Sequence, residues 1–128
     1  MKRLMLPLAK VGVALLLGLI VLVVVESQTR FLRRLYVDAV LDGRHHFLSC
    51  DQLPTEAEVR EIVNRHQPVI ERIERVNPGR IYVIIDTLCC PGKADLLIMY
   101  PSHADRAEIE KIINAPTFFG VPHRLRNI

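Results

Sequence analysis

Apolar residues dominate the first 25 positions of the chain. From Leu4 to Val25 the sequence runs for 22 residues, and Lys10 is the only charged residue among them. As a helix this stretch would be about 33 Å long, which matches the roughly 30 Å hydrocarbon core of a bilayer. Lys10 lies near the N-terminal end, so its ammonium group can reach the lipid head groups. The pattern predicts a transmembrane anchor over residues 1–27.

A cleaved signal peptide is the alternative, because Lys2 and Arg3 before an apolar run fit its beginning. However, the stretch from Val23 to Ser27 offers no small-x-small cleavage site, and no cysteine follows it at a lipoprotein position. We therefore expect an uncleaved, single-pass membrane protein that contacts the lipid bilayer. Basic residues flank both sides of the anchor, and their balance favours a soluble domain on the extracytoplasmic side.

Residues 28–42, within a juxtamembrane segment of residues 28–43, show the spacing of a helix that continues beyond the bilayer. Phe31, Leu35 and Ala39 recur at every fourth position, and Gly43 is a natural helix stop. This segment is either a rigid stalk or a helix that packs on a partner. Its polar side carries the basic residues that we expect at the membrane surface: Arg30, Arg33 and Arg34.

Residues 44–128 alternate between strand-like and helix-like patterns. Residues 45–50, 80–87 and 94–100 are short apolar runs that predict strands, and residues 117–128 predict a last edge strand. Thr55 and Glu58 form a capping box that begins a helix, which Pro68 should kink or split. Ser102 and Asp105 form a second capping box.

The resulting order is β-α-β-β-α-β, which predicts an α+β domain with the ferredoxin-like arrangement. In that arrangement four strands form an antiparallel sheet in the order 4-1-3-2, with both helices on one face. The part of the chain from Thr55 also resembles BON-type domains in the stretches GKADLLIMY and FGVPHRLRN. That resemblance implies a small α-β-β-α-β module associated with membranes or envelopes. Pro68 and the adjacent cysteines depart from it.

The charge of the soluble part is balanced. From Arg44 to Ile128 there are 11 basic and 11 acidic side chains, so the net charge of +3 belongs to the membrane-proximal segment. A nucleic-acid-binding domain would need its basic surplus on the folded part. We therefore expect no nucleic acid as a partner.

Three cysteines and one carboxylate are the candidate chemical group: Cys50, Cys89, Cys90 and Asp51. The predicted topology gathers them at one end of the sheet, away from His45 and His46. A disulfide from Cys50 to Cys89 or Cys90 would staple a small domain. Three thiolates with Asp51 could instead bind a soft metal, or the cysteines could be ordinary half-buried side chains. No CxxC or CxxCH motif is present.

The remaining polar residues form no recognisable catalytic set, because no histidine has a nucleophile or carboxylate at a familiar spacing. We therefore expect no enzyme and no resident cofactor. Alternation in the two central strands would leave an apolar patch on the face without helices: Tyr82, Ile84, Leu97 and Met99. These features predict a membrane-anchored interaction module, an accessory subunit that binds other subunits of a membrane complex. An energy-conserving or electron-transfer complex is one conceivable host, and a thiol or metal-binding protein is the alternative function.

Overall fold

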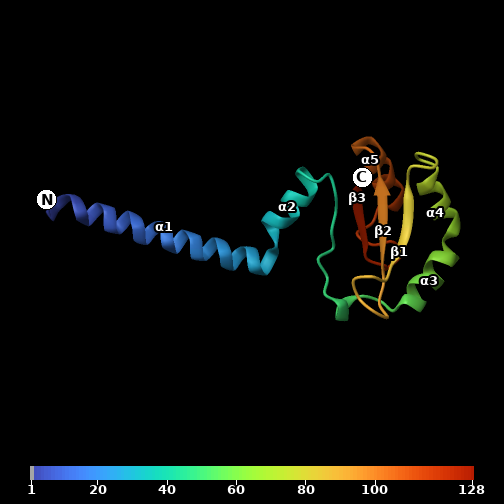
Figure 1. The fold of residues 1–128 in the computed structure, drawn as a ribbon, viewed down its shortest axis with the longest axis horizontal. Coiled ribbons are helices and arrows are strands. Elements are labelled where there is room, and N and C mark those ends of the chain that lie inside the picture. Colours follow the sequence, from blue (N-terminus) through green and yellow to red (C-terminus); the bar gives the residue numbers. More distant parts are fainter. Residues whose placement is uncertain (1) are drawn as a thin grey trace. The chain divides into compact units, whose positions relative to one another are not determined.

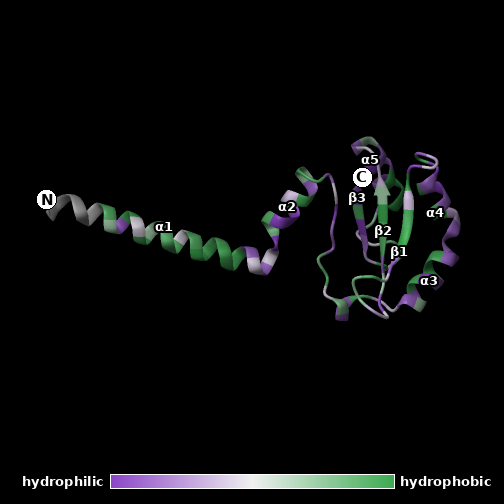
Figure 2. Cartoon of the chain, viewed as in Figure 1, coloured by the Kyte–Doolittle hydropathy of each residue, from purple (hydrophilic) through white to green (hydrophobic). Residues whose placement is uncertain are grey.

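The computed structural model describes residues 2–128, with side chains from Leu8 onward. By its internal contacts the chain divides into a first unit that ends at Tyr36 and a second unit from Val37 to Ile128. The first unit is mainly helix α1, Lys2–Thr29 (Figure 1). Its stretch Leu8–Thr29 is long and apolar enough to cross a membrane, and most of its ribbon has hydrophobic colours (Figure 2).

The helix after the apolar stretch is interrupted. Arg30 adopts a left-handed backbone conformation with φ of 49°, and a separate helix α2 covers Phe31–Ala39. The Glu26 carboxylate accepts hydrogen bonds from the backbone N–H groups of Leu32 (2.7 Å) and Arg33 (3.0 Å). This side chain therefore caps the beginning of α2. The expectation of one continuous helix over residues 28–42 is wrong.

The second unit begins its regular structure with the 3-10 turn Cys50–Gln52 and a divided helix. Helix α3 covers Glu56–Arg65 and helix α4 covers Gln67–Glu74, with the break at His66 and Pro68 in the first turn of α4. The predicted capping box is confirmed, because Thr55 accepts from the Glu58 N–H while the Glu58 side chain accepts from the Thr55 N–H. A proline lacks the N–H group that a continuous helix would need at this point, which explains the division.

Three strands form the sheet in the order β1-β2-β3: Tyr82–Asp86, Asp95–Tyr100 and His123–Asn127. Strands β1 and β2 are an antiparallel hairpin. Helix α5, His103–Ile113, then carries the chain back so that β3 lies parallel to β2. The prediction of an α+β domain holds, but the sheet has three strands of mixed direction, not four antiparallel ones. From α3 onward the elements follow the order of an α-β-β-α-β module, with the first helix divided.

The missing strand is the predicted first one, residues 45–50. Only Arg44 pairs with the sheet, through two backbone hydrogen bonds to Leu125 of 2.8 and 2.9 Å. The histidine rings then take the next backbone donors, since the Nδ1 atoms of His45 and His46 accept from the Phe47 and Leu48 N–H groups. Phe47 turns the chain with φ of 55°. Local side-chain bonds thus replace a strand ladder, and β3 pairs directly with β2.

The hydrophobic core lies between the sheet and the helices. Every second residue of β1 and β2 contributes to it, together with one face of each of helices α3, α4 and α5. Helices α3, α4 and α5 cover this face (Figure 1). The fully buried members with the largest side chains are Tyr100, Phe118, Ile73, Leu96, Ile98 and Ile109.

His123, the first residue of β3, is a polar side chain inside this core. It is 3% exposed, and its Nδ1 has no hydrogen-bond partner among the described residues. Burial is the main cause that lowers the pKa of His123 to about 4, and the nearby Arg44 lowers it further. The ring is therefore neutral in the folded domain at neutral pH.

The pKa of His123 makes the stability of the domain depend on pH. Between pH 6.5 and 4 the unfolded chain binds a proton that the folded chain does not, so stability falls as the pH falls through this window. A shift of this size corresponds to about 3 kcal/mol. We expect His123→Gln to abolish most of this loss in denaturant unfolding curves between pH 7 and 4.5. An unchanged pH dependence in the variant would contradict the assignment.

Candidate functional site

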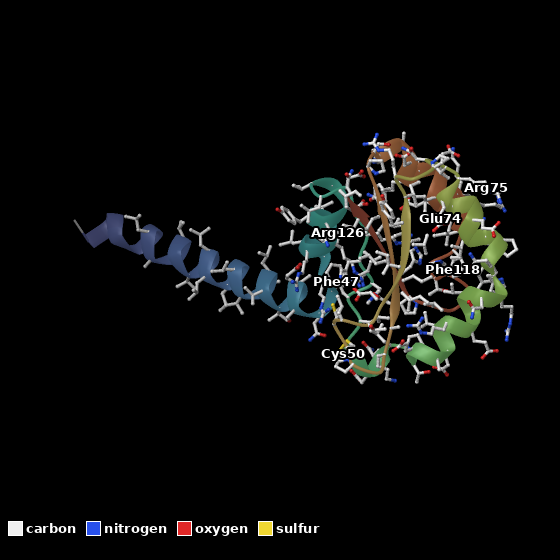
Figure 3. All side chains as sticks on the ribbon, turned by 45° about the vertical axis from the view of Figure 1, so that its right-hand side comes forward. Phe47, Cys50, Glu74, Arg75, Phe118 and Arg126 are labelled. Carbon is white, nitrogen blue, oxygen red and sulfur yellow. A yellow bond between two sulfur atoms is a disulfide. The ribbon has the colours of Figure 1, made fainter. Side chains whose placement is uncertain are left out.

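The face of the sheet opposite the helices divides into an apolar and a polar half. The apolar half, which we call the apolar patch, consists of two cross-strand pairs, Tyr82 with Met99 and Ile84 with Leu97. Tyr82 is 47% and Ile84 40% exposed, whereas Leu97 and Met99 are half-buried. The exposed Arg126 of β3, labelled in Figure 3, is the register partner of Met99 and lies at the rim of the patch. The structure thus brings the four predicted partner-face residues together as one surface.

The polar half is built around Asp95, the first residue of β2, which is 3% exposed. Its register partner on β1 is Asp86, so two carboxylates stand directly opposite each other. Arg124 of β3 resolves the repulsion: it donates from Nε and Nη2 to the two oxygens of Asp95, at 2.5 and 2.9 Å, and from Nη2 to Asp86. One guanidinium therefore joins all three strands.

His46 covers this charged group from the chain segment outside the sheet. Its Nε2 donates to Asp95 Oδ2 at 2.7 Å, since its Nδ1 is the acceptor of the Leu48 N–H. Burial opposes ionisation of Asp95, but the hydrogen bonds from His46 and Arg124 outweigh it and hold the pKa of this carboxyl below its usual value. The polar half is thus closed, whereas the apolar patch stays open.

The placement of His46 corrects one expectation. His45 and His46 were expected far from the cysteines, but both line a small pocket of about 80 Å³ together with Cys89 and Cys90. The reason is that residues 44–49 do not form a central strand. They cross from the outer edge of β3 towards the hairpin, and this brings both rings to the cysteine end of the sheet (Figure 1).

A disulfide joins Cys50 to Cys90 with the Cα atoms 5.5 Å apart. It ties the 3-10 turn to the β1–β2 hairpin, at the end of the domain where Figure 3 labels Cys50. Two backbone hydrogen bonds lie beside it, Ala94 N–H to the Pro54 carbonyl and Glu56 N–H to the Gly92 carbonyl. The disulfide therefore holds residues 45–50 against the sheet, which the predicted strand pairing would otherwise have done.

The third cysteine and Asp51 stay outside this bond. Cys89 is a free, exposed thiol. Asp51 is exposed as well, and a hydrogen bond from Ser49 lowers the pKa of its carboxyl. Disulfide sulfurs are not thiolate ligands, and the described residues include no cluster of three or more metal-binding side chains. The residues proposed for a metal site thus provide one thiol and one carboxylate.

A second polar network, which the sequence analysis missed, fixes the beginning of the unit. Arg106 of α5 is 7% exposed and binds Asp38, Asp42 (3.1 Å) and Glu110 (3.2 Å). Asp42 also accepts from Asn127 at 2.9 Å and pairs with His103 at 2.6 Å. The sequence did contain an indication of this network. Arg106 lies on the same buried stripe of the helix as Ile109, and an unpaired charge there would be costly, so acidic partners were to be expected.

No family model matches this chain, and the searches of curated proteins and of solved structures found no match to it either. Its function is therefore inferred from its own residues. The members of the two polar networks are bound to one another, although the network around Arg106 also lines an open pocket of about 730 Å³. The apolar patch presents Tyr82 and Ile84 to solvent on the open face of the sheet.

The staple has a predictable effect on stability. Because it closes a loop of 40 residues in the unfolded chain, we expect Cys50→Ser with Cys90→Ser to lower the free energy of unfolding by about 4 kcal/mol. Cys89→Ser is the matched control and should leave stability unchanged, since this thiol is free and exposed. Urea unfolding in detergent, with and without a reductant, measures both. Equal destabilisation by the two changes would refute the assigned pairing.

Proposed function

We propose that this protein is a single-pass membrane protein whose second unit is a non-enzymatic interaction module, and that it serves as an accessory subunit of a larger membrane complex. The observation that carries the proposal is the apolar patch. Tyr82 and Ile84 lie on the open face of the edge strand β1, where they are 47% and 40% exposed. Exposed apolar surface of this kind on a sheet is typical of binding sites for other proteins.

The composition of the patch fits a protein partner. A tyrosine, two branched aliphatic side chains and a methionine form its centre, and Arg126 lies at its rim. Protein interfaces are enriched in aromatic residues, methionine and arginine, and their charged groups lie at the periphery. The patch is small, so we expect it to be part of a contact that other elements of the chain complete.

The disulfide supports a location for the module. Structural disulfides persist in oxidising compartments and are rare in the cytosol. The Cys50–Cys90 bond therefore favours the extracytoplasmic side of the membrane, with Leu8–Thr29 as the membrane-spanning segment. This orientation agrees with the one expected from the basic residues on the two sides of the anchor.

The binding role is tested by Ile84→Ser with Leu97→Ser, which removes one cross-strand pair of the patch. We expect the partner to be lost in a pull-down from mild detergent, with an affinity about 30- to 1,000-fold lower, from a loss of about 2–4 kcal/mol. Leu88→Ser is the matched control, because Leu88 is 92% exposed and lies outside the patch. A variant that unfolds at markedly lower temperature yet keeps its partner would show that the patch serves the fold instead.

The exposed thiol of Cys89 provides a test of the anchor and its orientation. A membrane-impermeant maleimide should label Cys89 in intact cells, and Cys89→Ser should remove the label. The labelled chain should stay in the membrane after carbonate washing and keep its N-terminus, as mass spectrometry would show. A mature chain that begins near Ser27 would identify the apolar helix as a signal sequence, and labelling only after lysis would reverse the orientation.

A further inference from the structure

The outer edge of β1 is an unfinished side of the sheet. The sheet order gives β1 only one neighbour, β2. The opposite edge, at β3, is closed in part by the two backbone hydrogen bonds between Arg44 and Leu125. Within the described part of the chain, no backbone bond reaches residues 82–86 from the outer side. The backbone groups that point outward from β1 are thus available to another strand.

This edge lacks the features that usually keep edges apart. Proteins protect edge strands with proline, lysine, inward-pointing charges or bulges. Strand β1 reads YVIID, which contains none of these before its last residue, and Figure 2 shows its ribbon mainly in hydrophobic colours. Tyrosine, valine and isoleucine are also the residues that favour a strand most strongly.

The sequence around β1 is complementary to itself. In an antiparallel pairing centred on Val83, the Val83 residues of two copies face each other, and Tyr82 lies opposite Ile84. Ile81 then lies opposite Ile85, and Arg80 opposite Asp86. In this register, residues on the open face of one copy lie opposite residues on the open face of the other, and core-facing residues lie opposite core-facing residues. The two sheets therefore join with their open faces on the same side. Aromatic and β-branched side chains are a favourable cross-strand pair.

The charges at the two ends of the strand complete this match. Arg80 is exposed in the turn before β1, and Asp86 is the last residue of β1. The Asp86 side chain is 12% exposed. Its carboxylate accepts from Arg124 and from the Leu88 N–H, and each of its oxygens keeps a lone pair for a further bond. By two-fold symmetry the arginine–carboxylate pair occurs twice, and no like charges stand opposite each other.

We propose that two copies of this chain associate through antiparallel pairing of their β1 strands, in the register that places Val83 opposite Val83 of the second copy. The two sheets become one continuous sheet of six strands. The two apolar patches then lie side by side on its open face, since Tyr82 and Ile84 of each copy meet at the new junction. This inference goes beyond the proposed accessory role and does not depend on it.

The full-length protein in lipid nanodiscs or mild detergent provides the first test, with its mass measured over a range of concentrations. We expect a dimer whose dissociation constant rises at least tenfold in Ile84→Lys and in Arg80→Glu. Leu97→Lys is the matched control, because Leu97 is the register partner of Ile84 but lies one strand inside the edge. It should remain dimeric while it loses the partner of the apolar patch, which separates the two proposals.

Cysteine cross-linking tests the register without placing a charge at the edge. Tyr82→Cys and Ile84→Cys are produced together, each with Cys89→Ser. Opposed residues of an antiparallel pair have Cα atoms about 4.5–5.5 Å apart, within the range of a disulfide. We expect a cross-linked dimer at least fivefold more abundant from the mixture than from either variant alone.

Three outcomes would overturn the proposal. The first is a wild-type protein that stays monomeric at every concentration. The second is a dimer that Arg80→Glu and Ile84→Lys leave intact while both variants remain folded by circular dichroism, which would place the contact elsewhere in the chain. The third is equal cross-linking in the mixture and in the single variants. Loss of a different protein from the edge variants, with no dimer in the wild type, would assign the edge to that protein.

Discussion

The buried carboxylate of Asp95 organises the second unit. It stands opposite a second carboxylate, Asp86, in a ladder where like charges repel. The arrangement is stable because Arg124 binds both groups and His46 donates to Asp95. One charge cluster therefore joins four parts of the unit: strands β1, β2 and β3 and the segment that precedes helix α3. Each of these elements must be in place for the carboxylate to be compensated.

This requirement explains the asymmetry of the open face. The half that holds the carboxylates is closed by His46, and the disulfide between Cys50 and Cys90 holds the adjoining segment in place. The apolar half of the face has no charge to neutralise, and no element covers it. The apolar patch is what remains, and it extends to Tyr82 and Ile84 at the free edge of β1. The same packing thus leaves two adjacent surfaces for association.

Features that depend on nearby residues were predictable from the sequence. The capping box of Thr55 with Glu58 and the helix break near Pro68 each involve residues within one or two turns of one another. The hairpin of β1 and β2 followed from alternation, which also placed Tyr82 and Ile84 on one face. In each case the physical cause acts within a short stretch, so a single sequence contains it.

Features that depend on competition or on distant partners were mostly not predictable, although the Cys50–Cys90 disulfide was among the pairings expected. The stretch after Arg44 has the composition of a strand, but the rings of His45 and His46 take backbone donors that a ladder needs. Losing that strand changed the neighbours of β3 and with them the sheet order. The contact of Arg106 with Asp38 and Asp42 joins residues more than 60 positions apart. The position of Arg106 on the apolar stripe of α5 indicates that it needs acidic partners, but it does not identify them.

That contact has a mechanical consequence. The second unit begins at Val37, so any tension on the chain from the N-terminal unit enters the unit there. Within six residues the chain meets Arg106 through Asp38 and Asp42, and Asp42 is also bound to Asn127 at the end of β3. A force applied to the chain at Val37 therefore acts first on the polar contacts of Asp38 and Asp42, and only then on the hydrogen bonds between the strands. Tension at Val37 thus loads side-chain contacts of Asp38 and Asp42 while the sheet face keeps its shape.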